Sequence, residues 1–561
     1  MAMFNRYTLR GLRNALCAGA GLGVLGSAAI AQGPVAEPPL RLQTDYFGYA
    51  ASVSGRFTYS DNINLAPDPL SIEEYFFSTA VSGGAITSTN RFTGIVLGDL
   101  DFSYLADSSD FNISQNVGAT GTATVADNWL YVDVSGQTSR QLIGDNARFS
   151  RNINAARGQQ ANVHSFAASP YIYHRMPDQS SVALRYRYSQ VFIDDSDSIF
   201  AVLNRNFLND SRSHEVIATY DSGNLLDRAR FNLSAYGVDT TEDGSGFLPE
   251  FGYRQGAVEA SGQVALSRAF SLSGAVGYDE VETDDAAALF FDDEELSGVF
   301  WRAGFTASPN RRLNARIEYG ERYGDDFVDA DISYRVTERL TFAAGANRRF
   351  VTRAQNSSNR FREVQAQTLL YADQLRRGDE GSPRAVIDAA NQYASILNGT
   401  NAQTIGVGVV DQAYAALSTN YERTSFTLSG NYSDSDFGFR MIEAFDINAN
   451  LRRRLSRRIL AYGNVVYRFA DTVVDTATCE ANPLVFGINT LDPLFDVVEG
   501  CAALANQNGA TNTIIGSIGG EYQIYENVAA FAEYSYTERF SDVDFLEYSE
   551  NTAFIGVRLD F

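Results

Sequence analysis

The sequence predicts an all-β fold: a closed antiparallel transmembrane β-barrel of about 22 strands, within a range of roughly 16–24, with a helical insertion near residues 362–398. Three observations lead to this prediction. Apolar and polar residues alternate over stretches of about ten residues, which is the period of a β-strand. Short turns and long polar segments separate these stretches, and an export signal opens the chain. This combination is typical of barrels in the bacterial outer membrane.

The start of the chain has the features of a secretory signal peptide. Three arginines make it positive, an apolar run covers residues 16–29, and a small-residue cleavage site ends at Ala31. The run is too short and too rich in glycine to span a membrane as a helix, and no long apolar run follows it. The predicted division is a signal peptide (1–31), a short periplasmic lead-in (32–45) and the barrel (46–561).

The alternation assigns residues to two faces of each strand. In "SVALRYRYSQV", Val182, Leu184 and Tyr186 share one face, while Arg185 and Arg187 share the other. A soluble β-sandwich also alternates, so the alternation alone leaves that fold open. The stretches exceed the usual length of soluble strands, and aromatic residues gather near their ends, as in the interfacial girdles of membrane barrels. The membrane barrel is therefore the preferred interpretation.

Ten short turns are predicted at one end of the barrel, where Asp, Asn, Pro, Ser and Arg interrupt the alternation. Ten such turns imply eleven hairpins, hence about 22 strands with both chain ends on the periplasmic side. The turns lie near residues 87–90, 125–128, 176–180, 224–227, 268–269, 309–311, 337–338, 422–424, 456–457 and 525–526.

One connection stands out, because residues 352–410 interrupt the strand pattern with helical features. Ser382-Pro383 is a helix start, Val386, Ala390, Tyr393 and Leu397 recur at helical spacing, and "EVQAQTLLYADQLRR" precedes them. The segment is predicted to be a long loop with a helical hairpin. Two interpretations stay open: a plug inside the lumen, or an outward cap that packs on neighbouring loops.

Composition excludes some functions and suggests a disulfide. The formal net charge of −24 argues against nucleic acid as a partner. Cys479 and Cys501 follow the signal peptide and lie in one long segment, 471–511, which is predicted to be an extracellular loop. In an exported protein the expected state is a disulfide, and the alternative is two free thiols.

Charged residues on the polar faces are the candidate pore lining. Opposing ladders of arginine and carboxylate would create a transverse field in a water-filled pore, although any such barrel needs polar lining. The candidates are Arg185, Arg187, Arg316, Glu318, Arg348, Arg452, Arg454, Arg468 and Glu533.

No catalytic residue, cofactor or metal site is predicted. The densest acidic run could bind Ca²⁺ or Mg²⁺, but its spacing fits no calcium loop, so a solvated outer loop is favoured, with divalent ions bridging it to lipopolysaccharide. His164 and His214 would support a hydrolase only if one of them lay beside a nucleophile at the outer rim. The acidic candidates are Asp284, Asp285, Asp292, Asp293, Glu294 and Glu295.

The last ten residues, "TAFIGVRLDF", alternate to the end, with Ile555, Val557, Leu559 and Phe561 on the apolar face. This stretch is expected to be the last lipid-facing strand and to close on the first strand, so that no edge stays unpaired in the bilayer. A terminal strand ending in Phe resembles the signal read by the barrel-assembly machinery. We therefore expect that machinery as a partner during biogenesis.

Several motifs are similar to a known family. "FTYSDNINLAPD" (57–68), "VADNWLYVDVSGQTSRQ" (125–141) and "ASPYIYHRMPDQSSVALRYRYS" (168–189) resemble the PEP-CTERM-associated outer-membrane barrels, part of the beta-barrel porin 2 group. The sharpest motif is Ser60 to Leu65. The resemblance implies a barrel in the outer membrane and suggests a link to exopolysaccharide; it implies no catalytic residue.

The predicted function is a porin-like outer-membrane channel, without catalysis, for polar solutes or for exopolysaccharide export. The alternative is a structural or surface-interaction barrel with a sealed lumen, and an outer-membrane hydrolase is the most remote alternative. Expected partners are outer-membrane lipid, lipopolysaccharide and a polysaccharide chain.

Overall fold

The computed structural model describes most of the chain after Asp45. The described residues are 46–143, 148–152, 154–155, 157–194, 210–226, 228–243, 250–284, 296–352, 402–403, 407–421, 423–437, 440–481, 497–507 and 509–561. The signal peptide, the lead-in and the helices predicted near 362–398 lie outside them. Among these residues, no helix is long and apolar enough to cross a bilayer.

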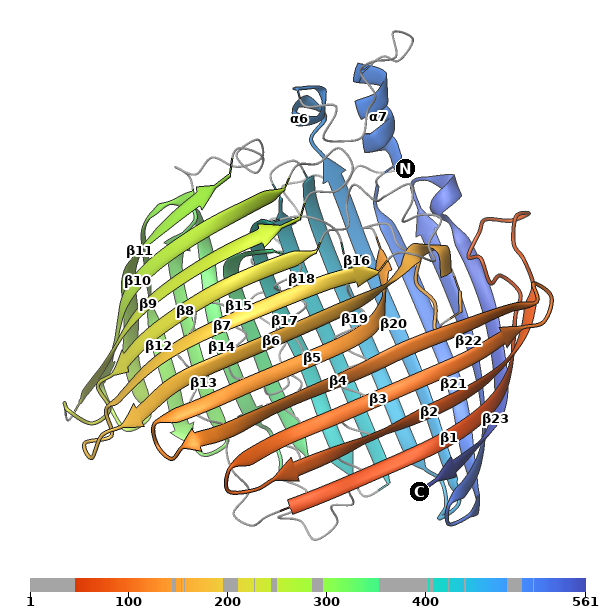
Figure 1. The fold of residues 1–561 in the computed structure, drawn as a ribbon, viewed down its shortest axis with the longest axis horizontal. Helices are drawn as coiled ribbons and strands as arrows, with labels where there is room; N and C mark the ends of the chain where they lie inside the picture. The colour runs from red at the N-terminus through yellow and green to blue at the C-terminus, as the bar shows by residue number, and fades with distance from the viewer. Residues whose placement is uncertain are drawn as a thin grey trace.

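The wall is a closed antiparallel barrel of 22 strands, as predicted (Figure 1). Over the described residues the sheet contains 23 strands, and one of them, the two-residue β16 (Ala402–Gln403), pairs in parallel with the end of β5. The wall strands are β1 (Tyr46–Ser60), β2 (Glu74–Ser88), β3 (Phe92–Leu105), β4 (Asp110–Ala126), β5 (Leu130–Ile143), β6 (Gln160–Arg175), β7 (Ser181–Asp194), β8 (Ser211–Asp221), β9 (Ala229–Glu242), β10 (Phe251–Ala265), β11 (Phe270–Thr283), β12 (Gly298–Asn310), β13 (Leu313–Arg322), β14 (Asp325–Arg335), β15 (Leu340–Thr352), β17 (Val407–Tyr421), β18 (Thr424–Asp436), β19 (Arg440–Arg454), β20 (Ile459–Val474), β21 (Thr511–Tyr525), β22 (Val528–Ser541) and β23 (Tyr548–Asp560).

Each wall strand pairs with its neighbour in the chain, and β1 pairs with β23 to close the ring. This closing ladder runs from Ser52 opposite Asp560 to Ser60 opposite Thr552. Closure leaves neither β1 nor β23 as an exposed edge, which matters because unpaired backbone groups are costly in lipid.

All ten predicted short turns are confirmed, because each overlaps a short connection at one end of the barrel. These connections are 89–91, 127–129, 176–180, 222–228, 266–269, 311–312, 336–339, 422–423, 455–458 and 526–527. Most connections at the other end are longer. An exception is the two-residue turn Tyr323–Gly324, whose φ angles of 55° and 74° explain the glycine, since two-residue hairpins favour positive φ.

The two predicted long loops have slightly different bounds in the structure. β15 ends at Thr352 and β17 begins at Val407, so the expected 352–410 connection is shorter at its C-terminal side. The expected 471–511 loop lies between Val474 and Thr511. It contains two short helices, α6 (Thr476–Ala481) and α7 (Val497–Gln507), which lie beyond the upper rim in Figure 1.

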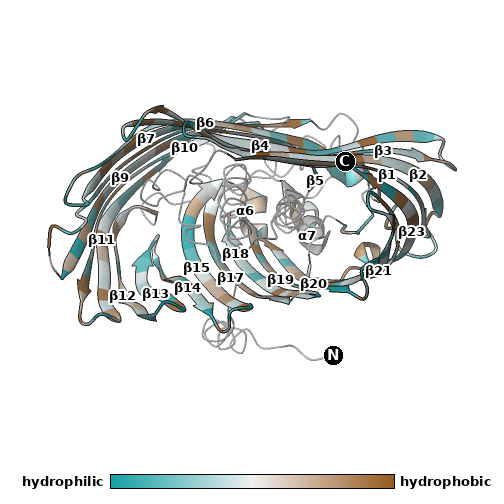
Figure 2. Cartoon of the chain, turned by 90° about the horizontal axis from the view of Figure 1, so that it is seen from below, coloured by the Kyte–Doolittle hydropathy of each residue, from teal (hydrophilic) through white to brown (hydrophobic). Residues whose placement is uncertain are grey.

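The two faces of the wall are inverted relative to a soluble protein. Outward aliphatic side chains are exposed, for example Ile518 at 69% and Ile555 at 63%, whereas inward Arg187 and Glu550 are only 4% and 1% exposed. Figure 2 shows the alternation as teal and brown bands along the strands of an elongated ring. The predicted faces of β7 are confirmed, since Val182, Leu184 and Tyr186 are exposed.

Exposed aromatic side chains lie near both ends of the strands. At the short-turn end these include Phe92, Trp129, Tyr421 and Tyr525; at the opposite end they include Tyr75, Tyr104, Phe111, Phe192 and Phe540. Two aromatic bands that flank a mainly aliphatic band are typical of a wall that meets a headgroup region on each side.

The wall is indented between β14 and β15. Their ladder ends at Ala330 opposite Ala346, although β15 continues to pair with β17 up to Thr352. After Ala346, β15 therefore leaves β14 and bends toward the interior. There the ring of Phe350 lies 5.1 Å from the ring of Tyr253, which is on the inner face of β10. The indentation therefore brings two distant parts of the wall into contact.

The closing seam between β1 and β23 is reinforced at its outer end. The backbone N–H and side-chain amide of Asn551 each donate to the carboxylate of Asp61, both at 2.7 Å. Asn62 donates to the carbonyl oxygen of Ser549 at 2.7 Å, and Ser60 Oγ donates to Glu550 at 2.7 Å. The sharpest motif of the sequence, Ser60 to Leu65, therefore has a structural role in barrel closure.

Candidate channel interior

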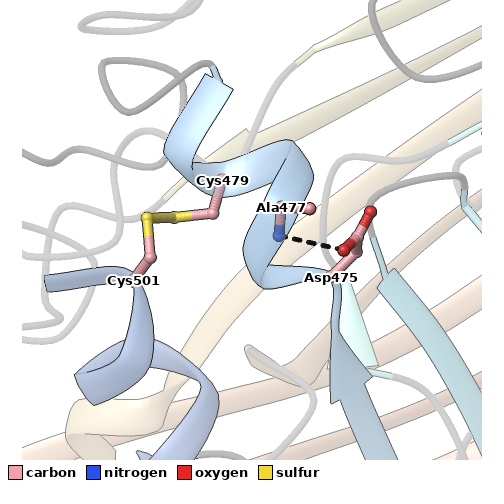
Figure 3. Close-up of a disulfide and its surroundings, with 4 residues drawn as sticks. All are labelled: Asp475, Ala477, Cys479 and Cys501. Atoms are coloured by element: carbon pink, nitrogen blue, oxygen red, sulfur yellow. Dashed lines mark hydrogen bonds between the residues drawn. A yellow bond between two sulfur atoms is a disulfide. The ribbon is translucent and has the colours of Figure 1, made fainter. Parts of the chain in front are cut away.

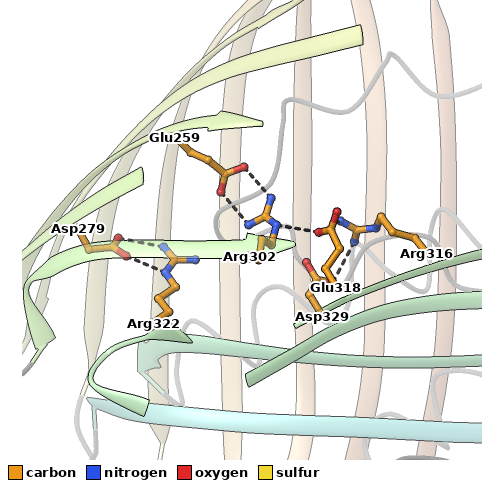
Figure 4. A network of polar contacts seen from close by, with 7 residues as sticks. All are labelled: Glu259, Asp279, Arg302, Arg316, Glu318, Arg322 and Asp329. Carbon is orange, nitrogen blue, oxygen red and sulfur yellow. Dashed lines mark hydrogen bonds and ion pairs between the residues drawn. The ribbon is translucent and has the colours of Figure 1, made fainter. Parts of the chain in front are cut away.

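A chain of alternating charges lines the inner face of β10 to β14 (Figure 4). Arg302 on β12 donates to both carboxylate oxygens of Glu259 on β10, at 2.6 and 2.8 Å. Its Nε also donates to Glu318 on β13 at 2.9 Å. One guanidinium thus connects a carboxylate on the adjacent strand β13 with one on β10, two strands away, and the two-pronged contact with Glu259 is the geometry in which arginine binds a carboxylate most strongly.

The same network extends along the wall in both directions. Arg316 donates to Asp329 at 3.0 Å and to Glu318 at 3.3 Å. Arg322 forms a two-pronged pair with Asp279 at 2.7 and 2.9 Å, and its guanidinium lies 4.4 Å from the ring centre of Phe300. These pairs cross-link β11 to β14 from the inside.

The tight curvature at this part of the wall depends on glycine. A Cβ atom on Gly304 would come within 1.9 Å of the Ile317 carbonyl oxygen, and one on Gly320 within 1.9 Å of the Trp301 carbonyl oxygen. Both glycines lie on the inner face beside Arg302 and Glu318. Their missing side chains let the neighbouring backbones approach and hold the charged residues close together.

Other inward arginines are paired in the same way. Arg185 donates to Asp133 at 2.8 Å and lies 4.0 Å from the ring centre of Tyr171. Arg187 pairs with Glu215, and both side chains are almost fully buried. Further inward pairs are Arg558 with Glu521 at 2.6 Å and Arg468 with Asp446 at 3.3 Å.

A segment between β5 and β6 folds into the barrel. Its described residues, 148–152 and 154–155, reach across to the inner face of β20 to β23. Phe149 exchanges two 2.8 Å hydrogen bonds with the hydroxyl of Tyr548. The guanidinium of Arg468 lies 3.8 Å from the centre of the Phe149 ring. A long polar segment between two strands predicts an outer loop, and for these residues that prediction is wrong. We call residues 148–152 and 154–155 the inward segment.

Charged and amide side chains anchor the inward segment. Arg151 donates to Glu533 on β22 at 2.8 Å, and Asn152 and Ser150 donate to the buried carboxylate of Glu550 on β23. On the other side, Asn154 donates to Ser103 on β3 at 3.0 Å. The inward segment therefore spans part of the lumen and is fixed at both sides.

Arg148 connects the inward segment to the outer rim. Its guanidinium donates to the Phe545 carbonyl oxygen at 3.0 Å. Burial lowers the pKa of Arg148, although an arginine stays charged in any ordinary solution. The segment therefore keeps a positive charge near the outer end of the seam.

An apolar cluster fills the opposite part of the interior. Tyr253 and Val281 from the inner wall pack with Tyr323, Phe350 and Val409 from the indented side. The hydroxyl of Tyr323 also accepts a 2.8 Å hydrogen bond from Gln255. The cluster narrows the interior on the side away from the inward segment.

The remaining predicted lining residues occupy different positions. Glu318 and Glu533 face the interior, but Arg452 and Arg454 are exposed beside the short turn at the end of β19. Arg348 lies on the face of β15 opposite to Arg349 and forms a 3.2 Å pair with Asp325. The charged interior thus includes some of the predicted residues and leaves others at its edges.

The other predicted sites lie away from this interior. Cys479 in α6 and Cys501 in α7 form a disulfide, and Asp475 accepts a 3.0 Å hydrogen bond from Ala477 at the start of α6 (Figure 3). Ile555 and Val557 face outward. Of the acidic run only Asp284 is described, and Asp285, Asp292, Asp293, Glu294 and Glu295 lie outside the described residues. No group of metal-ligating side chains occurs in the described ranges.

His164 and His214 lie on outward-facing positions of β6 and β8. His214 is 2.8 Å from the Tyr186 hydroxyl and opposite Asp239 in the β8–β9 register. The neighbouring serines, Ser211 and Ser213, are buried on the inward face. Among the described residues the side-chain contacts of His214 are therefore with Tyr186 and Tyr188, and not with a serine.

Sequence reasoning missed the residues that connect the network. Arg302, Glu259 and Asp279 fall on polar faces of strands that were predicted, so the alternation could have identified them. Arg151 had no such signal, because the inward segment has no periodicity.

No family model matches this chain, and no curated protein matches its sequence, so the family resemblance stays a prediction. Solved structures similar to it at low identity include siderophore and ferric-catecholate receptors. The siderophore receptor PirA from Acinetobacter baumannii is 8% identical over 92% of this chain and 80% of that chain, with a TM-score of 0.45. The ferric-catecholate import receptor Fiu from E. coli K12 is 9% identical over 91% of this chain and 81% of that chain, with a TM-score of 0.44.

Proposed function

We propose that this protein is an outer-membrane barrel that lets polar solutes cross the membrane and has no catalysis of its own. The observation that supports the proposal is the inverted wall, with aliphatic side chains outside and ion pairs inside. Moving one such aliphatic side chain from water to lipid is worth about 1.5–3 kcal/mol, so a wall of this kind favours a bilayer. The charged lining favours water and polar solutes in the interior.

The narrower form of the proposal is export of an exopolysaccharide chain. It has support from the resemblance of three sequence motifs to the PEP-CTERM-associated barrels. A flexible, hydroxyl-rich chain also matches an interior that alternates arginine and carboxylate groups, because hydroxyls both donate and accept hydrogen bonds.

A sealed structural barrel is the second candidate, and two observations favour it. The inward segment crosses part of the lumen, and the apolar cluster around Phe350 narrows another part. In this second form the barrel would act through its outer loops, with lipid and lipopolysaccharide as its surroundings.

Electrical recording distinguishes the two candidates. The purified protein, inserted in a planar lipid bilayer, is expected to give discrete conductance steps whose size scales with salt concentration. The control is the same preparation after heat unfolding, which should give no steps. Absence of conductance, both in the natural protein and in a variant whose inward segment is released from its anchors, would contradict the channel and favour the sealed barrel.

A further inference from the structure

A cavity of about 300 Å³ lies on the inner face beside the closing seam. Its walls come from β1 to β3 on one side and β22 and β23 on the other. Arg151 and Asn152 of the inward segment form part of the lining. A volume of this size is at the lower end of the range for small-molecule sites, so one compact ligand unit fits. The seam and the inward segment together create this site.

The charges inside the cavity are mostly neutralised by internal pairs. Arg56 donates to Asp101 at 2.6 Å, and Arg151 pairs with Glu533 at 2.8 Å. Asp99, the third carboxylate near this lining, forms no hydrogen bond or ion pair within the described part of the chain. With Glu533 counted, two arginines and three carboxylates meet at the cavity, so Asp99 is in excess of the two internal pairs and is available to a ligand.

The rest of the lining is suited to a hydroxyl-rich ligand with one apolar face. Ser54, Thr58 and Ser82 present hydroxyls that can donate or accept hydrogen bonds. Phe554 and Phe76 add aromatic surface, and the guanidinium of Arg56 lies 5.9 Å from the centre of the Phe554 ring. A pyranose ring has this combination, because its hydroxyls lie around the edge and its C–H groups form an apolar face.

We propose that this cavity binds one sugar unit of a passing chain and prefers a sugar that carries an amine. The unpaired carboxylate of Asp99 attracts a positive amine, while a sugar that carries a carboxylate is repelled. The inference rests on the proposed function and deepens it, since it names the class of solute that the interior recognises. Binding can be measured without any transport.

Isothermal titration calorimetry on the detergent-solubilised barrel tests the proposal with three trisaccharides: one of glucosamine, one of glucose and one of galacturonic acid. We expect the glucosamine trisaccharide to bind most tightly, the glucose trisaccharide to bind more weakly, and the galacturonate to bind least. The Asp99→Asn variant should lose about ten-fold in affinity for the glucosamine trisaccharide only, as expected when one close charge pair is removed. The Phe554→Leu variant should weaken binding of both uncharged and amine-bearing sugars.

Asp331→Asn is the matched control, because Asp331 is another inward carboxylate, on β14, far from the cavity. It should leave all three affinities unchanged. The proposal is overturned if none of the trisaccharides binds, if galacturonate binds as tightly as glucosamine, or if Asp99→Asn and Asp331→Asn behave alike. A barrel that conducts ions but binds no sugar would overturn only this inference, whereas one that binds sugar without conducting would contradict the channel.

Discussion

The variant Arg302→Met is expected to unfold at markedly lower denaturant concentration than the natural protein, with a loss of about 3 kcal/mol in the free energy of unfolding. Arg302 donates three hydrogen bonds to Glu259 and Glu318, and all three side chains are largely buried. Its removal leaves two carboxylates close together in the wall without their shared counter-charge. Methionine keeps the length of the side chain, so the effect is electrostatic more than steric.

Urea titration of the barrel in lipid vesicles, followed by the heat-dependent mobility of the folded form, measures this loss. The control is Arg254→Met, since Arg254 and Asp239 form a 3.5 Å pair in which both side chains are mostly exposed. Exposed pairs contribute about 0–1 kcal/mol, so the control should differ little from the natural protein. A triple variant that adds Glu259→Gln and Glu318→Gln should recover part of the loss. Equal behaviour of Arg302→Met and Arg254→Met would show that the inward network does not stabilise the wall.

Releasing the inward segment is expected to increase the single-channel conductance by at least about two-fold, because conductance follows the open cross-section of the pore. The variant Arg151→Ala with Asn152→Ala removes the contacts to Glu533 and Glu550. The contacts of Phe149 with Tyr548 and of Asn154 with Ser103 remain, so the variant loosens the middle of the segment over the seam side of the lumen. The wall itself is unchanged by the two substitutions.

The matched control for this experiment is Arg157→Ala. Arg157 follows the same segment, but its 2.6 Å pair with Asp110 is partly exposed. This control should keep the natural conductance. A double variant that is folded and has an unchanged conductance would mean that the anchors at Arg151 and Asn152 do not limit the pore.

The strands and their faces could be predicted from the sequence because both depend on local patterns. A period of two places Arg185 and Arg187 opposite Leu184 whatever the rest of the chain does, and lipid on one side makes the pattern strict. The short turns were equally local, since their residue types are set by the geometry of the turn. The predicted strands and turns therefore agree with the structure, for example in the hairpins formed by "VADNWLYV" and "YQIYENVAAFAEY".

The contents of the lumen could not be predicted in this way. A polar stretch such as the inward segment has the same composition whether it lies in outer solvent or in a water-filled interior. Its position depends on partners hundreds of residues away, such as Tyr548 and Glu550. The indentation of β15 similarly depends on the contact between Phe350 and Tyr253, which no local pattern encodes.

The motif from Ser60 to Leu65 shows an intermediate case. The sequence marked it as the sharpest motif, and the structure explains it by the bonds of Asp61 and Asn62 across the closing seam. Leu65 is fully buried against Ala155 and Tyr548, so the motif also supports the inward segment. This distinctive loop motif is therefore explained by its role in closing the barrel, and it need not mark a ligand site.

The central claim is that the outward face of the wall meets lipid and the inward face meets water. Spin labels placed singly along β11, at positions 271 to 276, test it most directly in reconstituted vesicles. Labels at Leu272 and Val276, which are 52% and 55% exposed on the outward face, should collide mainly with dissolved oxygen, which concentrates in lipid. Labels at Ser271 and Ser273 should show low oxygen accessibility, giving a period of two along the strand. Equal access of a water-soluble nickel chelate to Leu272, Val276 and their neighbours would contradict the membrane barrel.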